Sequence, residues 1–214
     1  VMESGLGILQ GKNSELTYEK KHELNLGIDL GFLDNRINFS MDWYKRKNYD
    51  LIGWLSTTGL DGEIGKYANV ASMRSHGIEL TLSTRNIAKK DFKWNTDFIF
   101  SKTKNKVTNL EAFSSVMDMV SGYGFAMQGY PVRSLFSLDF RGLNEEGLPT
   151  FINENGELTT SNINFQERNN KSHLIYEGTT DPTITGSLGN VFSYKGLKPV
   201  SYTHLRAHET SLHL

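Results

Sequence analysis

The segment Leu24-Asn-Leu-Gly-Ile-Asp-Leu-Gly-Phe32 decides the fold, because large apolar residues alternate in it with small or polar ones. A period of two places the apolar side chains on one face of a β-strand and the others on the opposite face. The next residues, Leu33-Asp-Asn-Arg36, are typical of a tight turn, since Asn and Asp tolerate the left-handed backbone region. The alternation resumes at Ile37 and runs to Trp43, which predicts a hairpin.

Three further segments, 78–82, 92–101 and 184–194, show the same alternation, and the last ends in a turn at Lys195-Gly196. A short polar connection joins the first two, whereas residues 46–75 and 102–181 form long stretches rich in Gly, Asn and Ser. Long connections are uncommon in compact domains but are typical of the extracellular end of outer-membrane barrels. The sequence therefore predicts an all-β fold: an antiparallel segment of a transmembrane β-barrel, with about five strands in an open sheet and long extracellular loops.

The composition excludes several classes of protein. The 214 residues include no cysteine, which excludes a disulfide framework and thiolate metal sites. The chain has 23 Lys and Arg against 24 Asp and Glu, so it has no strong charge to attract nucleic acid. No apolar run reaches the roughly 18 residues of a transmembrane helix, whereas the strands of a membrane barrel are only half apolar.

Both ends of the sequence stand apart from this pattern. The chain begins at Val1 without a signal peptide, so we expect the natural N-terminus to lie upstream. Residues 200–214 resemble a translated sequencing adaptor, which divides the chain into a partial barrel over 1–199 and a non-native tail over 200–214. His204 and His208 are four residues apart, a spacing that would suit a metal site on a helix, but the expected origin of the tail argues against one.

In a barrel, the apolar stripes of the strands face lipid. The residues expected there are Leu24, Leu26, Ile28, Leu30, Ile37, Phe39, Met41, Ile78, Leu80 and Leu82. A soluble β-sandwich would show the same alternation, with the stripes buried beneath a second sheet. The regular exchange of short and long connections favours the barrel.

Several short motifs occur in a specific order along residues 13–198. They include Asn13-Ser-Glu-Leu-Thr-Tyr-Glu-Lys20, Asp42-Trp-Tyr-Lys-Arg46, His76-Gly-Ile-Glu-Leu80 and Asn190-Val-Phe-Ser-Tyr-Lys-Gly-Leu197. Together they resemble the SusC/RagA branch of the TonB-dependent outer-membrane receptors. Tyr18 stands where that family usually has Trp, and Ser75-His76 also departs from its pattern.

This resemblance implies a multi-pass transporter barrel of the 22-stranded type, with a plugged lumen, in the outer membrane of a Gram-negative cell. The implied partners are outer-membrane lipid, a SusD-like surface lipoprotein, a glycan or peptide substrate, and the TonB complex, which would act through an N-terminal part that this chain lacks. The resemblance implies no cofactor. A soluble carbohydrate-binding sandwich and a passive porin are the alternative functions.

The sequence predicts no catalytic residue and no metal site, so we expect no enzyme. The best candidates for substrate contact are aromatic residues in the long connections, because rings stack on sugar faces and also suit peptides. These are Trp54, Tyr67, Tyr123, Phe125 and Tyr130. Packing within the loops or docking of the lipoprotein would use the same rings. The basic stretch Lys102-Thr-Lys-Asn-Lys106 is interpreted as a charge cluster at a strand end rather than as a contact with anionic lipid.

Overall fold

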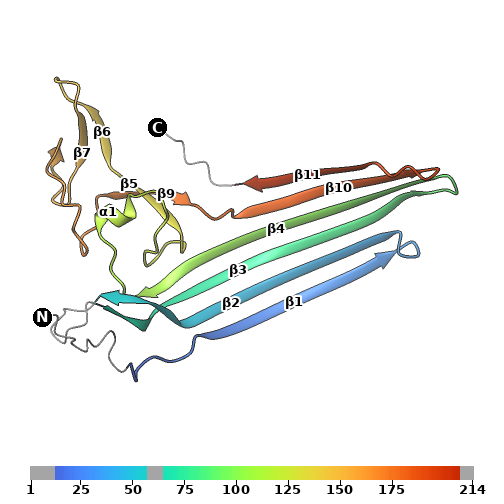
Figure 1. Cartoon of the computed structure of the whole chain (residues 1–214), viewed down its shortest axis with the longest axis horizontal. Helices are drawn as coiled ribbons and strands as arrows, with labels where there is room; N and C mark the ends of the chain where they lie inside the picture. The colour runs from blue at the N-terminus through green and yellow to red at the C-terminus, as the bar shows by residue number, and fades with distance from the viewer. Residues whose placement is uncertain (1–12, 57–64, 208–214) are drawn as a thin grey trace, which may run out of the picture.

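The structure, a computed structural model, describes residues 13–56 and 65–207. A six-stranded antiparallel sheet with the order β1-β2-β3-β4-β10-β11 carries most of the chain (Figure 1). Its strands are β1 (Lys20–Phe32), β2 (Ile37–Ser56), β3 (Gly65–Ala88), β4 (Phe92–Leu110), β10 (Ile184–Tyr194) and β11 (Val200–Ala207). This architecture confirms the all-β antiparallel fold, and the sheet is open rather than closed.

The predicted tight turns are confirmed. Leu33, Asp34 and Asn35 have φ angles of 53°, 54° and 57°, and the amide of Arg36 donates to the carbonyl of Leu33 at 3.1 Å. Lys195 and Gly196 also have positive φ angles, 44° and 91°. The three short connections lie at one end of the sheet, on the right in Figure 1, and the long connection between β4 and β10 lies at the other end.

The strands are longer than the sequence predicts. β2 has 20 residues and β3 has 24, so much of the stretch 46–75 is paired strand and not loop. At about 3.3 Å per residue, β3 is about 80 Å long, more than twice the length of the roughly 9–11 tilted residues with which a barrel strand crosses a membrane. The apolar alternation stops where the strand leaves the expected membrane zone, while main-chain pairing continues, because backbone hydrogen bonds do not require apolar side chains. The prediction that Trp54 and Tyr67 lie in loops is therefore wrong.

The structure also adds a strand at the C-terminal end. Residues 200–207, which the sequence analysis set aside, form β11 and pair with β10 from Val191↔Val200 to Ile184↔Ala207. A bare strand edge offers unpaired amides and carbonyls to any extended segment, so this pairing does not depend on where the segment comes from. The adaptor origin stays a prediction. His204 lies in this strand and not on a helix, and His208 lies outside the described residues.

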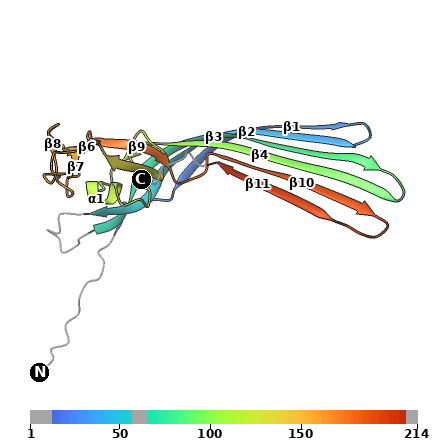
Figure 2. The same ribbon diagram turned by 90° about the horizontal axis from the view of Figure 1, so that it is seen from above.

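The connection between β4 and β10 folds into a small region of its own beside the end of the sheet (Figures 1 and 2). It contains α1 (Val116–Met119), the pair β5 (Ser134–Leu138) and β9 (Leu174–Thr179), and the three-stranded sheet of β6 (Phe140–Leu143), β7 (Pro149–Ile152) and β8 (Leu158–Thr159). Val116, Met119, Phe136 and Leu174 form its buried apolar cluster. Residues 111–183 therefore carry their own core.

Candidate functional site

The strand registers place the apolar stripes of neighbouring strands side by side. One row runs through Leu30, Phe39 and Leu82, and the next through Ile28, Met41 and Leu80. Since side chains alternate between faces, all ten predicted lipid-facing residues lie on the same face of the sheet. We call this face the outer face, and the apolar rows on it the apolar band.

The apolar band is open to the surroundings. On the edge strand β1, Leu24, Leu26, Ile28 and Leu30 are 44–58% exposed. In the part of the chain that the structure describes, the other sheets lie in the region 111–183 beyond one end of the strands (Figures 1 and 2). The soluble-sandwich alternative requires a second sheet over this face, so the structure contradicts it.

The apolar band includes residues that the sequence analysis did not select as lipid-facing. Phe98 and Phe100 of β4 pair with Leu82 and Leu80, and Leu188 of β10 pairs with Phe98. The two phenylalanines stand in an alternating segment, but only the register shows that they continue the same rows.

Aromatic and polar side chains border the apolar band at the end with the short turns. The rings of Trp94 and Phe192 stack with centroids 5.6 Å apart. The indole Nε1 of Trp94 donates to Oδ1 of Asn190 at 3.0 Å, and the hydroxyl of Thr96 donates to the same oxygen at 2.8 Å. A ring with an apolar body and a satisfied polar atom suits the boundary between hydrocarbon and water.

The opposite, inner face is polar. The hydroxyl of Ser40 donates to Asp29, and the hydroxyl of Ser83 donates to Asp97 at 2.7 Å. Arg46 donates to Glu23 at 2.8 Å, and its guanidinium lies 4.2 Å from the centroid of the Tyr44 ring. Asp29, Asp97 and Glu23 on this face therefore have hydrogen-bond partners on neighbouring strands.

Tyr44 crosses this inner face over a glycine. Its hydroxyl lies 2.7 Å from Oγ1 of Thr103, and the side chain is only 5% exposed. A Cβ atom at Gly77, which lies between these two strands, would sit 2.5 Å from the Tyr44 hydroxyl and 2.8 Å from the carbonyl oxygen of Lys102. Only glycine leaves room for the ring, so Tyr44 ties together β2, β3 and β4.

The five predicted substrate-contact residues fall into separate places. Trp54 and Tyr67 face each other across β2 and β3, edge to face, with ring centroids 5.3 Å apart, and are 50% and 52% exposed. A Cβ atom at Gly65 would lie 2.5 Å from the Trp54 ring, so this ring covers the Gly65 backbone. These two rings form an exposed aromatic pair near the long-connection end of the sheet.

The other three lie in the region 111–183. Tyr123 is 77% exposed. Phe125 and Tyr130 pack against the buried cluster of this region, and the Tyr130 ring contacts Phe136 and Tyr176 at centroid distances of 5.3 and 5.0 Å. The structure therefore brings Trp54 and Tyr67 together but keeps them apart from the packed rings.

The region 111–183 is attached to the free edge of β4, beyond the point where β10 begins to pair. The amide of Val107 donates to the carbonyl of Tyr130 at 2.8 Å, and the amide of Gly129 donates back to Val107 at 2.9 Å. The amide of Val132 donates to Oδ1 of Asn105 at 2.9 Å. The two bonds with Val107 satisfy backbone groups of β4 that would otherwise lie on an open edge.

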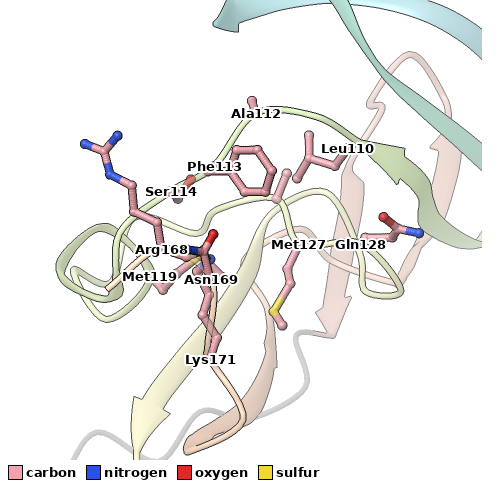
Figure 3. A pocket seen from close by; sticks show the side chains of 11 residues that line it. Leu110, Ala112, Phe113, Ser114, Met119, Met127, Gln128, Arg168, Asn169 and Lys171 are labelled. Carbon is pink, nitrogen blue, oxygen red and sulfur yellow. The ribbon is translucent and has the colours of Figure 1, made fainter. Parts of the chain in front are cut away.

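A pocket of about 160 Å³ opens within this region (Figure 3). Phe113, Met119 and Met127 give it apolar walls, and Arg168 and Lys171 stand beside them. Asn169, which also lines the pocket, lies between the two cations in the close view. A second pocket, of about 170 Å³, shares Phe113, Arg168 and Asn169 and reaches Leu55 at the end of β2.

The carboxylates near this pocket accept hydrogen bonds from residues of their own turns. Hydrogen bonds from the hydroxyl and the amide of Ser115 lower the pKa of Asp118. The amides of Asn170 and Asn169 lower the pKa of Glu167, whose Oε1 they contact at 3.0 and 2.6 Å. Burial lowers the pKa of Lys171, which donates to the carbonyl of Arg168. Arg168 also lowers the pKa of Asp118, and Lys171 that of Glu167, so each cation beside the apolar walls of the pocket has a carboxylate near it.

Among the described residues, no group of three or more His, Cys, Asp or Glu side chains could hold a metal ion. None of the helices in residues 13–56 and 65–207 is long and apolar enough to cross a membrane.

Comparison with curated proteins finds receptors of one kind. The chain is 28% identical over 151 residues to TonB-dependent receptor P3 of Formosa agariphila, which covers 67% of this chain and 15% of the receptor. It is 31% identical over 99 residues to TonB-dependent receptor SusC of Bacteroides thetaiotaomicron, which covers 46% of this chain and 10% of SusC. The chain thus spans only a small part of the length of the curated relatives it matches.

Solved structures show the same fold. The structure of the RagAB peptide transporter matches with a TM-score of 0.72 and 23% identity, over 94% of this chain and 22% of that chain. The RagAB peptide importer in its closed-closed state matches with a TM-score of 0.71 and 24% identity.

The family model described as TonB dependent receptor-like, β-barrel matches residues 4–170, which is most of the chain. Together with the relatives above, this match confirms the resemblance drawn from the sequence motifs. The chain belongs to the TonB-dependent receptor-like β-barrel family.

Proposed function

We propose that this chain is part of an outer-membrane transporter that imports nutrient oligomers with energy transmitted by TonB. The exposed apolar band is the observation that carries this proposal. The paired strands β1–β4 and β10 present it on one face, and the opposite face is polar, as in a barrel with lipid outside and an aqueous lumen inside. In a bilayer every backbone polar group needs a partner within the protein, so further strands of the barrel would pair with the free edge of β1 and with the edge of β10 that residues 200–207 of the predicted tail cover here.

The orientation follows from the connections. Outer-membrane barrels have short periplasmic turns and long extracellular loops. The short turns of this sheet would then face the periplasm, and the region 111–183 would face the outside. The rings of Trp94 and Phe192 at the short-turn end of the apolar band agree with a membrane interface at that end, since aromatic rings concentrate at such interfaces.

The substrate would be a glycan or a peptide captured at the extracellular end. Trp54, Tyr67 and Tyr123 offer exposed rings there, whereas Phe125 and Tyr130 would act by shaping the region 111–183. The pocket lined by Phe113, Met119 and Arg168 lies at the same end. A SusD-like surface lipoprotein is the partner we propose for this end, where Phe140, Leu143 and Leu158 also expose apolar surface.

The test uses the full-length protein that carries this chain. Ile28→Arg places a charge in the middle of the apolar band and should lower the stability of the inserted barrel by about 2–4 kcal/mol. Asn25→Arg, on the inner face of the same strand, is the matched control and should insert normally. Heat-modifiable migration from outer-membrane fractions measures insertion, and uptake of labelled glycan and peptide oligomers, with and without TonB, measures transport.

Two outcomes would contradict the proposal. Equal tolerance of arginine at both positions would mean that the apolar band does not face lipid. Uptake that persists without TonB would indicate the passive-porin alternative.

A further inference from the structure

A second pattern lies on the outer face, directly beyond the apolar band on the side of the long connection. In the register of β2, β3 and β4, Lys47 pairs with Arg74 and Arg74 with Lys106. The adjacent row is Lys45, His76 and Lys104, and Lys102 pairs with Ile78, which itself belongs to the apolar band. The six lysine and arginine residues form what we call the basic patch: Lys45, Lys47, Arg74, Lys102, Lys104 and Lys106.

The basic patch and the apolar band share one continuous face. The pairing of β2 with β3 is regular from Ile37 to Asn48, and that of β3 with β4 is regular from Met73 to Arg85. The register shifts lie outside these segments, so side-chain alternation is unbroken from the apolar rows to the cations. All six residues of the basic patch are exposed.

These cations have no acidic partners. Among the ion pairs of the described residues, none includes a member of the basic patch. The nearby carboxylates Glu23 and Glu79 stand opposite Arg46 and Asp42, on the inner face. Arg46, only one residue from two patch lysines, is paired with Glu23 at 2.8 Å. The carboxylates of this part of the sheet thus lie on the inner face, and the outer face presents the patch cations without a carboxylate beside them.

This arrangement disfavours the sheet unless an anion is present. Neighbouring strands are about 4.8 Å apart and alternate residues about 6.7 Å apart, so each cation faces others at short range. Like charges directly opposite each other across strands are destabilising. A phosphate group carries several acceptor oxygens and can bridge two or more such cations.

We propose that the basic patch binds the phosphate groups of an outer-leaflet glycolipid of the lipid A type. One amphiphile would lay its acyl chains on the apolar band and its phosphates on the adjoining cations, which is why a lipid fits this surface better than a soluble anion. The position agrees with the orientation proposed above, because the basic patch lies on the long-connection side. The inference rests on that membrane placement.

The experiment uses the full-length receptor, purified in neutral detergent and titrated with lipid A and, separately, with inorganic phosphate. The variant Lys47→Gln/Arg74→Gln/Lys106→Gln removes the central row. The matched control, Lys89→Gln/Lys90→Gln/Lys93→Gln, removes three exposed cations at the short-turn end. Near an anionic lipid surface each cation contributes roughly fivefold to binding, so the first variant should bind lipid A about 100-fold more weakly and the control should match the wild type.

Native mass spectrometry counts the retained lipid, and heat-modifiable migration shows that each variant is folded. Unchanged lipid A binding by the first variant, or an equal loss in the control, would overturn the proposal. Inorganic phosphate that displaces lipid A at similar concentrations would also overturn it, because the site would then recognise free phosphate. A wild-type receptor that fails to insert into membranes would instead contradict the proposed function.

Discussion

The six-stranded sheet and the region 111–183 obtain their stability in different ways. The region 111–183 buries an apolar cluster that includes Val116, Met119 and Phe136, as a small water-soluble fold does. The sheet instead exposes Leu24, Leu26 and Ile28 and relies on main-chain pairing together with a few cross-strand ties such as Tyr44. In the proposed membrane placement, lipid covers the apolar side chains of the sheet, whereas the region 111–183 buries its apolar side chains within its own fold.

The largest expected effect comes from a substitution that tests whether the region 111–183 has an independent core. Met119→Ala removes a side chain that is 1% exposed, and cavity formation at such sites costs about 2–5 kcal/mol. Hydrogen exchange in the full-length receptor should therefore quicken across residues 111–183 and remain unchanged in β1 and β2. Met117→Ala, on the same helix but 53% exposed, should leave both regions as they are. Faster exchange in β1 would mean that the two regions unfold together.

A smaller effect is expected from the hydroxyl of Tyr44, which links strands of the sheet. Tyr44→Phe removes the hydroxyl that contacts Thr103 and should lower barrel stability by about 1 kcal/mol. The ring still covers Gly77, so the register should be preserved. Urea-induced unfolding in detergent, followed by tryptophan fluorescence, measures the change. A stability equal to that of the wild type would show that Tyr44 acts only through its ring.

The smallest effect concerns the pH dependence of α1. Because hydrogen bonds from Ser115 lower the pKa of Asp118 below 3.8, the ionised carboxylate stabilises this turn at any pH above that value. The contribution, about 0.5 kcal/mol for such a cap, is lost as the pH falls through the lowered pKa. Asp118→Asn should therefore be less protected than the wild type near neutral pH, and the difference should disappear in acid. Hydrogen exchange of residues 115–120, corrected for intrinsic rates, measures it, and a constant difference would exclude this carboxylate as the cause.

Much of the sheet could be predicted from the sequence because its cause is local. The alternation from Leu24 to Phe32 and the turn at Asp34-Asn35 act within a hairpin, and the structure confirms both. The ends of the strands could not be predicted, since Trp54 and Tyr67 lie where pairing with the neighbouring strand, and not apolar alternation, maintains the strand.

The basic patch and the pocket could be predicted even less well than the strand ends, because both depend on contacts between residues far apart in the sequence. Lys102, Lys104 and Lys106 were visible as a brief basic stretch, but their meeting with Lys47 and Arg74 requires the register of three strands. The pocket beside Arg168 and Lys171 likewise joins segments more than 50 residues apart, from Leu110 to Lys171. No spacing within the sequence indicates such a meeting.

The length of β3 has a mechanical consequence for the proposed transporter. Residues 65–73 extend about 30 Å along the strand beyond the basic patch, which would mark the level of the headgroups. This part of the sheet would therefore form the wall of a vestibule outside the membrane, and the Trp54–Tyr67 pair would lie close to the rim of that vestibule. Because barrel strands are tilted by about 35–45°, an oligomer bound at that rim would descend roughly 20–25 Å through water before reaching the depth of the acyl chains. A short ligand would therefore leave the rim entirely before entering the membrane-spanning lumen.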